Sequence, residues 1–149
     1  MKTVFDKQYR DELATRIDTL TEGDKPLWGK MTVCQMVKHC ALWQEWVLLD
    51  RPLKRVFMGR LLGRMLLKKE MQSEVMRKNN PSSPELIVTD TDLVLDQERG
   101  RLTALIAQYG TYAYPANGMV HPFFGKMTKE QLGYFTYKHL DHHLRQFGR

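Results

Sequence analysis

Residues 128–147 read TKEQLGYFTYKHLDHHLRQF, and this stretch decides the fold class of the chain. Thr128 and Gln131 have the spacing of a capping box, in which each side chain bonds to the backbone N–H of the other residue at the start of a helix. The spacing predicts a helix from Thr128 to Phe147. Apolar and polar side chains at helical intervals form its inward line: Leu132, Phe135, Thr136, His139, His143 and Gln146. A long helix that turns imidazoles toward a core is therefore the first expectation.

Three more helices of similar length are predicted from apolar residues at helical spacing. They cover about residues 5–20, 32–50 and 91–110, and the second begins with another capping-box spacing, at Thr32 and Gln35. Stretches rich in Pro, Asn, Ser and Gly lie between helices, at residues 77–92 and 111–126. No alternating strand pattern competes with the helices. The sequence therefore predicts an all-α fold, a four-helix bundle with a longer crossover connection and a short extra helix.

The size of the chain indicates one ordinary domain. A chain of 149 residues can bury a core without disulfides or a structural metal, so we expect residues 1–149 to form a single domain. No apolar run approaches the roughly 20 residues of a transmembrane helix, and the first residues are too charged for a secretory signal. Cys34 and Cys40 lie on different faces of one predicted helix and are expected to stay reduced. These features predict a cytoplasmic protein.

Basic residues cluster in residues 51–69, RPLKRVFMGRLLGRMLLKK, within a chain of net charge +6. Pro52 breaks the preceding helix, and apolar residues then recur at three- and four-residue steps, which predicts an amphipathic helix over about residues 52–69. One interpretation is a membrane-surface or nucleic-acid contact. The interpretation we favour is a connecting helix whose apolar side docks on the bundle while its long cations extend into water. Nucleic acid is not an expected partner, since no aromatic stacking platform accompanies the helix.

Two histidines of the last helix are placed to bind one metal ion. His139 and His143 are four residues apart, so their side chains stack on one face with Cβ atoms about 5–6 Å apart. His142 is three residues from His139 and could replace His143 as a ligand, but it lies toward the edge of the inward line. Asp141 is expected to point outward, which argues against an acid–base role for it.

His39 on the second helix is a third candidate ligand. It lies beside the apolar stripe, with Gln35 one turn before it and Trp43 one turn after it. Three neutral imidazoles that meet in a core each need a polar partner. A metal ion satisfies all three and keeps a coordination position for water or substrate. The pattern therefore predicts a divalent metal site of His39, His139 and His143, with zinc or nickel expected first and iron or manganese as alternatives.

Three motifs carry a family resemblance: WGKMT at residues 28–32 followed by His39, HPFFG at residues 121–125, and HLDHHLRQ at residues 139–146. Together they resemble the DinB-like superfamily of metal-binding four-helix bundles over about residues 28–147, and most closely an uncharacterised branch of it. The resemblance places the metal ligands on His39, His139 and His143. It also implies a homodimer, and a metal-dependent transferase or isomerase that uses a low-molecular-weight thiol with a small-molecule substrate.

The remaining candidate residues each have a functional and a structural interpretation. His121 is a proton carrier near the metal or a hydrogen-bonding residue of its loop. Gln35 and Gln146 orient a bound water or are plain amides on a helix face, and Trp43 lines a pocket or belongs to the core. Two other functions stay open: a non-catalytic protein that binds metal or a small ligand, and a basic adaptor that contacts nucleic acid or a membrane.

Overall fold

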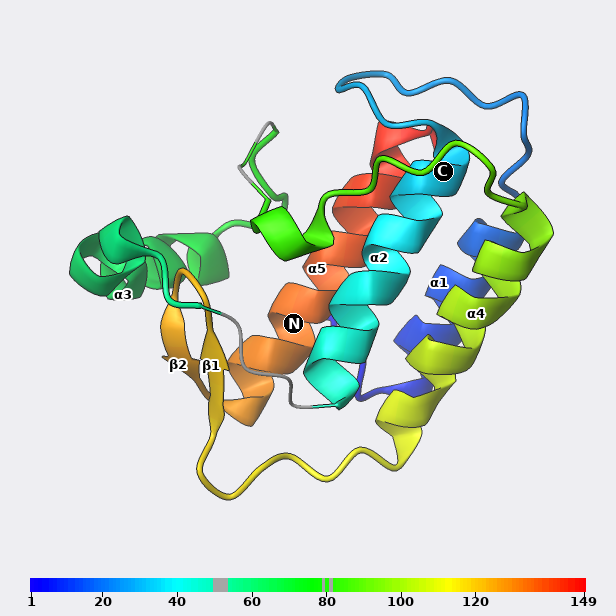
Figure 1. Cartoon of the computed structure of the whole chain (residues 1–149). Coiled ribbons are helices and arrows are strands. Elements are labelled where there is room, and N and C mark those ends of the chain that lie inside the picture. The colour runs from blue at the N-terminus through cyan, green and yellow to red at the C-terminus, as the bar shows by residue number, and fades with distance from the viewer. Residues whose placement is uncertain (50–53, 79, 81) are drawn as a thin grey trace.

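The computed structural model describes residues 1–49, 54–78, 80 and 82–149, and most of the regular structure in them is helical (Figure 1). The α-helices of these residues are α1 (Lys7–Asp18), α2 (Val33–Leu48), α3 (Phe57–Gln72), α4 (Leu95–Ala107) and α5 (Lys129–Gln146). Two 3₁₀ turns and one small hairpin join them: η1 (Pro84–Leu86), η2 (Gln108–Gly110), β1 (Met119–His121) and β2 (Gly125–Met127). The predicted break at Pro52 lies outside the described residues.

Helices α1, α2, α4 and α5 form a bundle, and α3 stands beside it next to the hairpin (Figure 1). In the bundle α2 and α1 each contact both α4 and α5. The predicted all-α bundle with an extra helix is confirmed. Both capping boxes are present, at Thr32 with Gln35 and at Thr128 with Gln131, so local sequence sets the start of α2 and of α5. None of the helices in the described ranges has the length and apolar character needed to cross a membrane.

Helix α4 is shorter at its start than predicted. It begins at Leu95 instead of residues 91–92, and its last turn tightens into η2. The chain before α4 is held against α2, because the Asp90 carbonyl accepts a hydrogen bond from Gln35 Nε2 at 3.1 Å. The Asp90 carboxylate also pairs with Lys38 Nζ at 3.0 Å. These contacts give the segment side-chain partners on α2 in place of a first helical turn.

Helix α5 is buried on nearly every side, which the single inward line did not anticipate. The expected outward direction of Asp141 is wrong: this residue is 5% exposed, and its carboxylate pairs with Arg16 of α1 at 2.8 Å and with Arg145 at 2.7 Å. On another side, Lys138 is 1% exposed and pairs with Glu70 of α3 at 2.6 Å. The physical reason is that α1, α2 and α3 all contact α5, so polar positions of α5 are covered and must find charged partners.

A small antiparallel hairpin forms where the sequence predicted irregular chain. Its register places Met119 opposite Met127 and His121 opposite Gly125. Gly125 has a φ of +81°, a conformation that residues with a Cβ rarely adopt, so glycine closes the turn of the HPFFG motif. Each strand has three residues, which is too short for an alternating pattern to be recognised in the sequence.

Helix α3 docks on the hairpin through glycine. A Cβ atom at Gly59 would lie 2.3 Å from the Phe123 carbonyl oxygen, and one at Gly63 would lie 2.2 Å from the same atom. Only a residue without a side chain permits this approach of the helix to the loop. Helix α3 does contact α5 of the bundle, but the expectation that its apolar residues form the docked side is wrong, because Phe57 and Leu61 are 72% and 69% exposed.

Candidate metal centre

Three imidazoles converge between α2 and α5. His39 comes from α2, and His139 and His143 come from successive turns of α5. One nitrogen of each ring lies within 4.8 Å of the corresponding nitrogens of the other two. All three residues are buried, with 3%, 8% and 8% of their surfaces exposed. This group could hold a metal ion, and it consists of the three residues that the sequence predicted to meet.

Hydrogen bonds fix the protonated nitrogen of two of these rings. His39 Nδ1 lies 2.8 Å from the Leu86 carbonyl oxygen in η1, and since a carbonyl only accepts, Nδ1 carries the proton. His143 Nδ1 donates to Gln146 Oε1 at 2.9 Å, and Gln146 Nε2 in turn donates to the Trp28 carbonyl at 2.7 Å. Each ring therefore presents an Nε2 lone pair. Partners of this kind orient the imidazole ligands of metal sites.

His139 has the least settled hydrogen bonding of the three. Its Nε2 lies 3.2 Å from His39 Nε2, which carries no proton and can only accept. Its Nδ1 is buried without a hydrogen-bond partner among the described residues. A cation among the three nitrogens would replace the proton needed between the two Nε2 atoms. A set of three imidazole nitrogens fits a metal ion, and coordination through His139 Nε2 would leave the proton of that ring on Nδ1.

The three rings are neutral at neutral pH, as metal ligands must be. Burial lowers the pKa of His143 from 6.5 to about 3, and the nearby His39 lowers it further. Burial also puts the pKa of His139 well below 6.5, with added lowering by the neighbouring imidazoles. The pKa of His39 is lowered by burial, against a raising effect of its bond to Leu86. Protons therefore compete weakly with a metal for these nitrogens.

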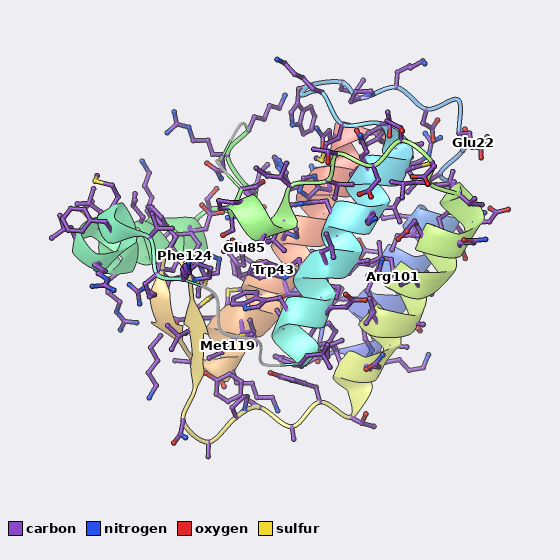
Figure 2. The ribbon with its side chains drawn as sticks, viewed as in Figure 1. Glu22, Trp43, Glu85, Arg101, Met119 and Phe124 are labelled. Carbon is purple, nitrogen blue, oxygen red and sulfur yellow. The ribbon has the colours of Figure 1, made fainter. Side chains whose placement is uncertain are left out.

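His121 lies one aromatic layer away from the three histidines. Its ring is 5.4 Å from the Trp43 ring, which is itself 5.2 Å from the ring of His139. His121 Nδ1 accepts from the backbone N–H groups of Phe123 at 3.1 Å and Phe124 at 3.2 Å, so its proton is on Nε2. Burial and then the charge of Arg55 lower the pKa of His121 to about 3. Figure 2 shows Trp43 extending from α2 toward the side on which Phe124 and the hairpin lie.

Of the two glutamine candidates, only Gln146 lies at the histidine group. Gln146 contacts His143, whereas both polar atoms of the Gln35 amide are engaged at the start of α2, with Thr32 and Asp90. Trp43 Nε1 is buried and has no hydrogen-bond partner in the described part of the chain.

His142, predicted to lie toward the edge of the inward line, is buried. It is 8% exposed, with its ring 5.5 Å from that of Trp28 and 5.1 Å from that of His143. Sequence reasoning missed two backbone contributors, the carbonyls of Leu86 and Trp28. No sequence signal identifies them, because every residue has a carbonyl.

The fold and this site define a helical protein with a buried three-histidine group that could bind a metal ion. Residues 4–149 match the model of a family described as "Protein of unknown function (DUF1569)", and the chain belongs to that family. The same comparisons find no match among curated proteins or solved structures.

Proposed function

We propose that the protein is a divalent-metal-dependent enzyme of the thiol-dependent transferase or isomerase type, with His39, His139 and His143 as its ligands. The observation that carries the proposal is the convergence of three neutral imidazoles, two of which have their protons fixed on the far nitrogen. The resemblance to the DinB-like superfamily supports the reaction class, the thiol cosubstrate and a homodimer. Three histidines suit zinc or nickel, with iron or manganese as alternatives.

The metal would supply Lewis acidity that lowers the pKa of a thiol or water nucleophile. The ligand set contains no carboxylate, so the charge of the ion would not be reduced by its protein ligands. The residues around the ligands have separate tasks. Gln146 holds the His143 ring in one orientation through its bond to Nδ1. Trp43 Nε1, a buried donor without an acceptor, would bind an acceptor atom of the small-molecule substrate.

His121 belongs to the proposal as the residue that handles a proton or a hydrogen bond on the hairpin side. Its Nδ1 is occupied by two backbone N–H groups, so only Nε2–H can act on a substrate. With its pKa lowered to about 3, mainly by burial, the ring stays neutral at physiological pH. His121 would therefore act as a neutral imidazole donor and not as an imidazolium acid.

The experiment that tests the proposal is elemental analysis of the untagged protein and its His39→Ala, His143→Ala and His142→Ala variants. His142 is a matched control, because it is a buried histidine next to His143 that is not part of the group. We expect near-stoichiometric metal in the parent and the control, and its loss in the two ligand variants with the helical circular dichroism retained. Metal that is absent and cannot be restored with zinc, nickel or manganese would refute the proposed site.

A second function, metal binding without turnover, is supported by how closed the site is, since no more than 8% of any of the three histidines is exposed. The two functions differ in one measurement on the metal-loaded protein. The enzyme should consume a low-molecular-weight thiol in the presence of an electrophile, and the His143→Ala variant should not. A loaded protein that consumes neither, across a panel of thiols and electrophiles, is a binding protein.

A further inference from the structure

Helix α3 turns an apolar face toward water. Five of the large apolar side chains that are exposed in the described residues lie on this one helix: Phe57, Met58, Leu61, Leu62 and Met65. Three of them, Phe57, Leu61 and Met65, recur every fourth residue and are 72%, 69% and 62% exposed. The opposite face carries Gly59, Gly63 and Leu67, which are buried against the hairpin side of the protein. A helix that hides glycines and exposes large apolar residues has a surface suited to a partner.

Positive charge borders this apolar face. Helix α3 carries Arg60, Arg64, Lys68 and Lys69 and a single acid, Glu70, which is occupied by the buried Lys138. The exposed side of α3 therefore combines apolar and cationic side chains without a free carboxylate.

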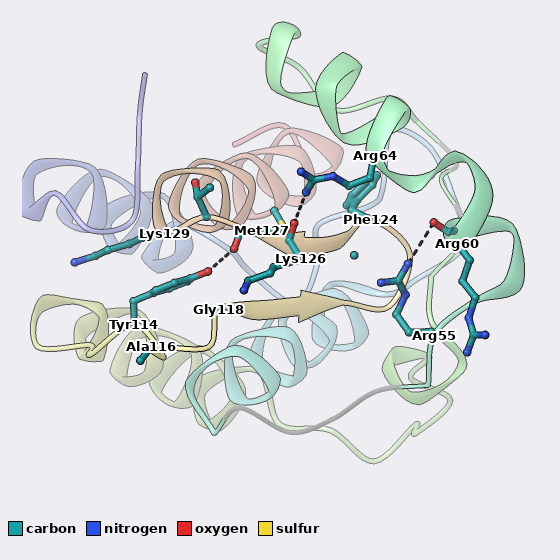
Figure 3. A pocket seen from close by; sticks show the side chains of 13 residues that line it. Arg55, Arg60, Arg64, Tyr114, Ala116, Gly118, Phe124, Lys126, Met127 and Lys129 are labelled. Carbon is teal, nitrogen blue, oxygen red and sulfur yellow. Dashed lines mark hydrogen bonds between the residues drawn. The ribbon is translucent and has the colours of Figure 1, made fainter.

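A basic pocket continues the surface between α3 and the hairpin (Figure 3). Its volume is about 500 Å³, and five cationic residues and no acid line it: Arg55, Arg60, Arg64, Lys126 and Lys129. Arg64 reaches across it to donate to the Lys126 carbonyl at 2.6 Å, which ties α3 to β2. Arg55 Nε is buried without a hydrogen-bond partner in the described part of the chain. The pocket therefore offers cationic side chains, and no carboxylate, to an anion.

We propose that α3 and this pocket form a docking surface for an anionic lipid bilayer, which we call the α3 surface. A helix lying flat on a membrane buries its apolar face at the boundary between headgroups and acyl chains, while its cations contact anionic headgroups. The α3 surface has both parts in the required order, with apolar side chains outward and Arg60, Arg64 and the pocket beside them. Because α3 lies to one side of the bundle, the helix can contact a flat surface with the bundle behind it (Figure 1).

Charge and apolarity together favour lipid over two other occupants. A second copy of this chain docked by the same face would bring two sets of like charges together, in a protein of net charge +6. A nucleic acid would pair with the cations but would leave Phe57, Leu61 and Met65 in water. Anionic lipid satisfies the cations and the apolar side chains at once.

Vesicle co-sedimentation of the full chain tests the proposal, with vesicles of phosphatidylcholine alone and of phosphatidylcholine mixed with phosphatidylglycerol. We expect binding only to the anionic vesicles, and weaker binding as salt is added. The pair Leu61→Ser with Met65→Ser should weaken binding on the order of 100-fold, from the loss of apolar burial. The pair Arg60→Gln with Lys68→Gln should weaken it about 30-fold, because each cation contributes roughly a factor of five.

Two matched variants control for exposure and charge. Leu27 and Ile87 are 70% and 60% exposed elsewhere on the protein, so Leu27→Ser with Ile87→Ser should leave vesicle binding unchanged. The exposed Lys25 and Lys30 precede α2, so Lys25→Gln with Lys30→Gln removes the same charge away from the α3 surface. All these positions are exposed, and every variant should keep the parent's circular dichroism.

Four results would overturn the proposal. The first is an absence of binding to anionic vesicles at low salt, and the second is an equal loss of binding in the α3 variants and their controls. The third is self-association in sedimentation velocity that the Leu61→Ser, Met65→Ser variant abolishes, which would assign the surface to a second copy. The fourth is tight binding to a DNA or RNA fragment that requires the same cations in the absence of vesicle binding.

Discussion

Replacing Gly63 by alanine should destabilise the protein, although alanine is the better helix former. An alanine Cβ would lie 2.2 Å from the Phe123 carbonyl oxygen and 3.1 Å from the Phe124 Cα atom, whereas ordinary contacts of such atoms are 3.4–4 Å. The first overlap exceeds 1 Å and involves backbone, which cannot rotate away as a side chain could. Overpacking of this kind costs about 1–3 kcal/mol. The gain in helix propensity is about 1 kcal/mol, so the free energy of unfolding should fall by up to about 2 kcal/mol.

Gly100→Ala is the matched control, because Gly100 lies within α4 and a Cβ there would have no atom within 4 Å. That substitution should raise the free energy of unfolding by about 0.5–1 kcal/mol. Urea denaturation followed by far-ultraviolet circular dichroism measures both free energies, and in thermal unfolding the Tm of Gly63→Ala should fall by up to about 6 °C. If Gly63→Ala proved as stabilising as Gly100→Ala, α3 would not pack on the hairpin by its glycine face.

Four further predictions test the helix contacts and the histidines. Lys138→Met should lower the free energy of unfolding by about 3 kcal/mol in urea titrations, because it leaves the Glu70 carboxylate of α3 without its buried partner. A loss under about 1 kcal/mol would mean that α3 moves away from α5 at little cost. Thr128→Ala, which removes the cap of α5, should cost about 1 kcal/mol in the same assay. Gln146→Leu should weaken metal affinity about 10- to 100-fold in a competition with a chelator, without unfolding the protein. In the metal-free protein the free energy of unfolding should fall as the pH drops from about 6.5 toward 3. The reason is that His121 and His143 take up protons in the unfolded chain but not in the folded protein, where their pKa values are about 3. Urea titrations at several pH values should give a slope of up to about 1.4 kcal/mol per pH unit for each histidine.

The helices and the grouping of three histidines follow from local rules, and this is why the sequence predicted them. A capping box is complete within four residues, so Thr32 and Thr128 identify the starts of α2 and α5 without knowledge of the rest of the fold. The four-residue step from His139 to His143 fixes their common face in any helix. The apolar residues of α2 indicated which way His39 points. The one long-range inference was that this face of α2 meets the histidine face of α5 in a bundle.

What the sequence did not predict depends on which neighbour covers each surface. Asp141 occupies a helix position that would face water in a bundle of equal helices, and it is buried because Arg16 of α1 lies over it. The apolar residues of α3 suggested that this face would be the docked one. The close approach to Phe123 shows that Gly59 and Gly63 form the contact with the hairpin turn, and glycine contributes nothing to an apolar pattern. Periodicity predicts the apolar face of a helix but does not identify its partner.

The HPFFG segment joins the two surfaces that the proposals concern. The Phe123 carbonyl meets the glycines of α3, while the neighbouring Phe124 packs against His121 with ring centroids 4.6 Å apart. His121 then contacts Trp43, whose ring lies against that of His139. A movement of α3 on docking would therefore have a route to the metal centre through this loop, beside the direct contact of α3 with α5. Because Gly63→Ala forces α3 away from Phe123, it perturbs that route without altering a histidine. If Gly63→Ala weakens metal affinity and Gly100→Ala does not, the metal centre depends on the hairpin. If neither does, α2 and α5 hold the centre by themselves.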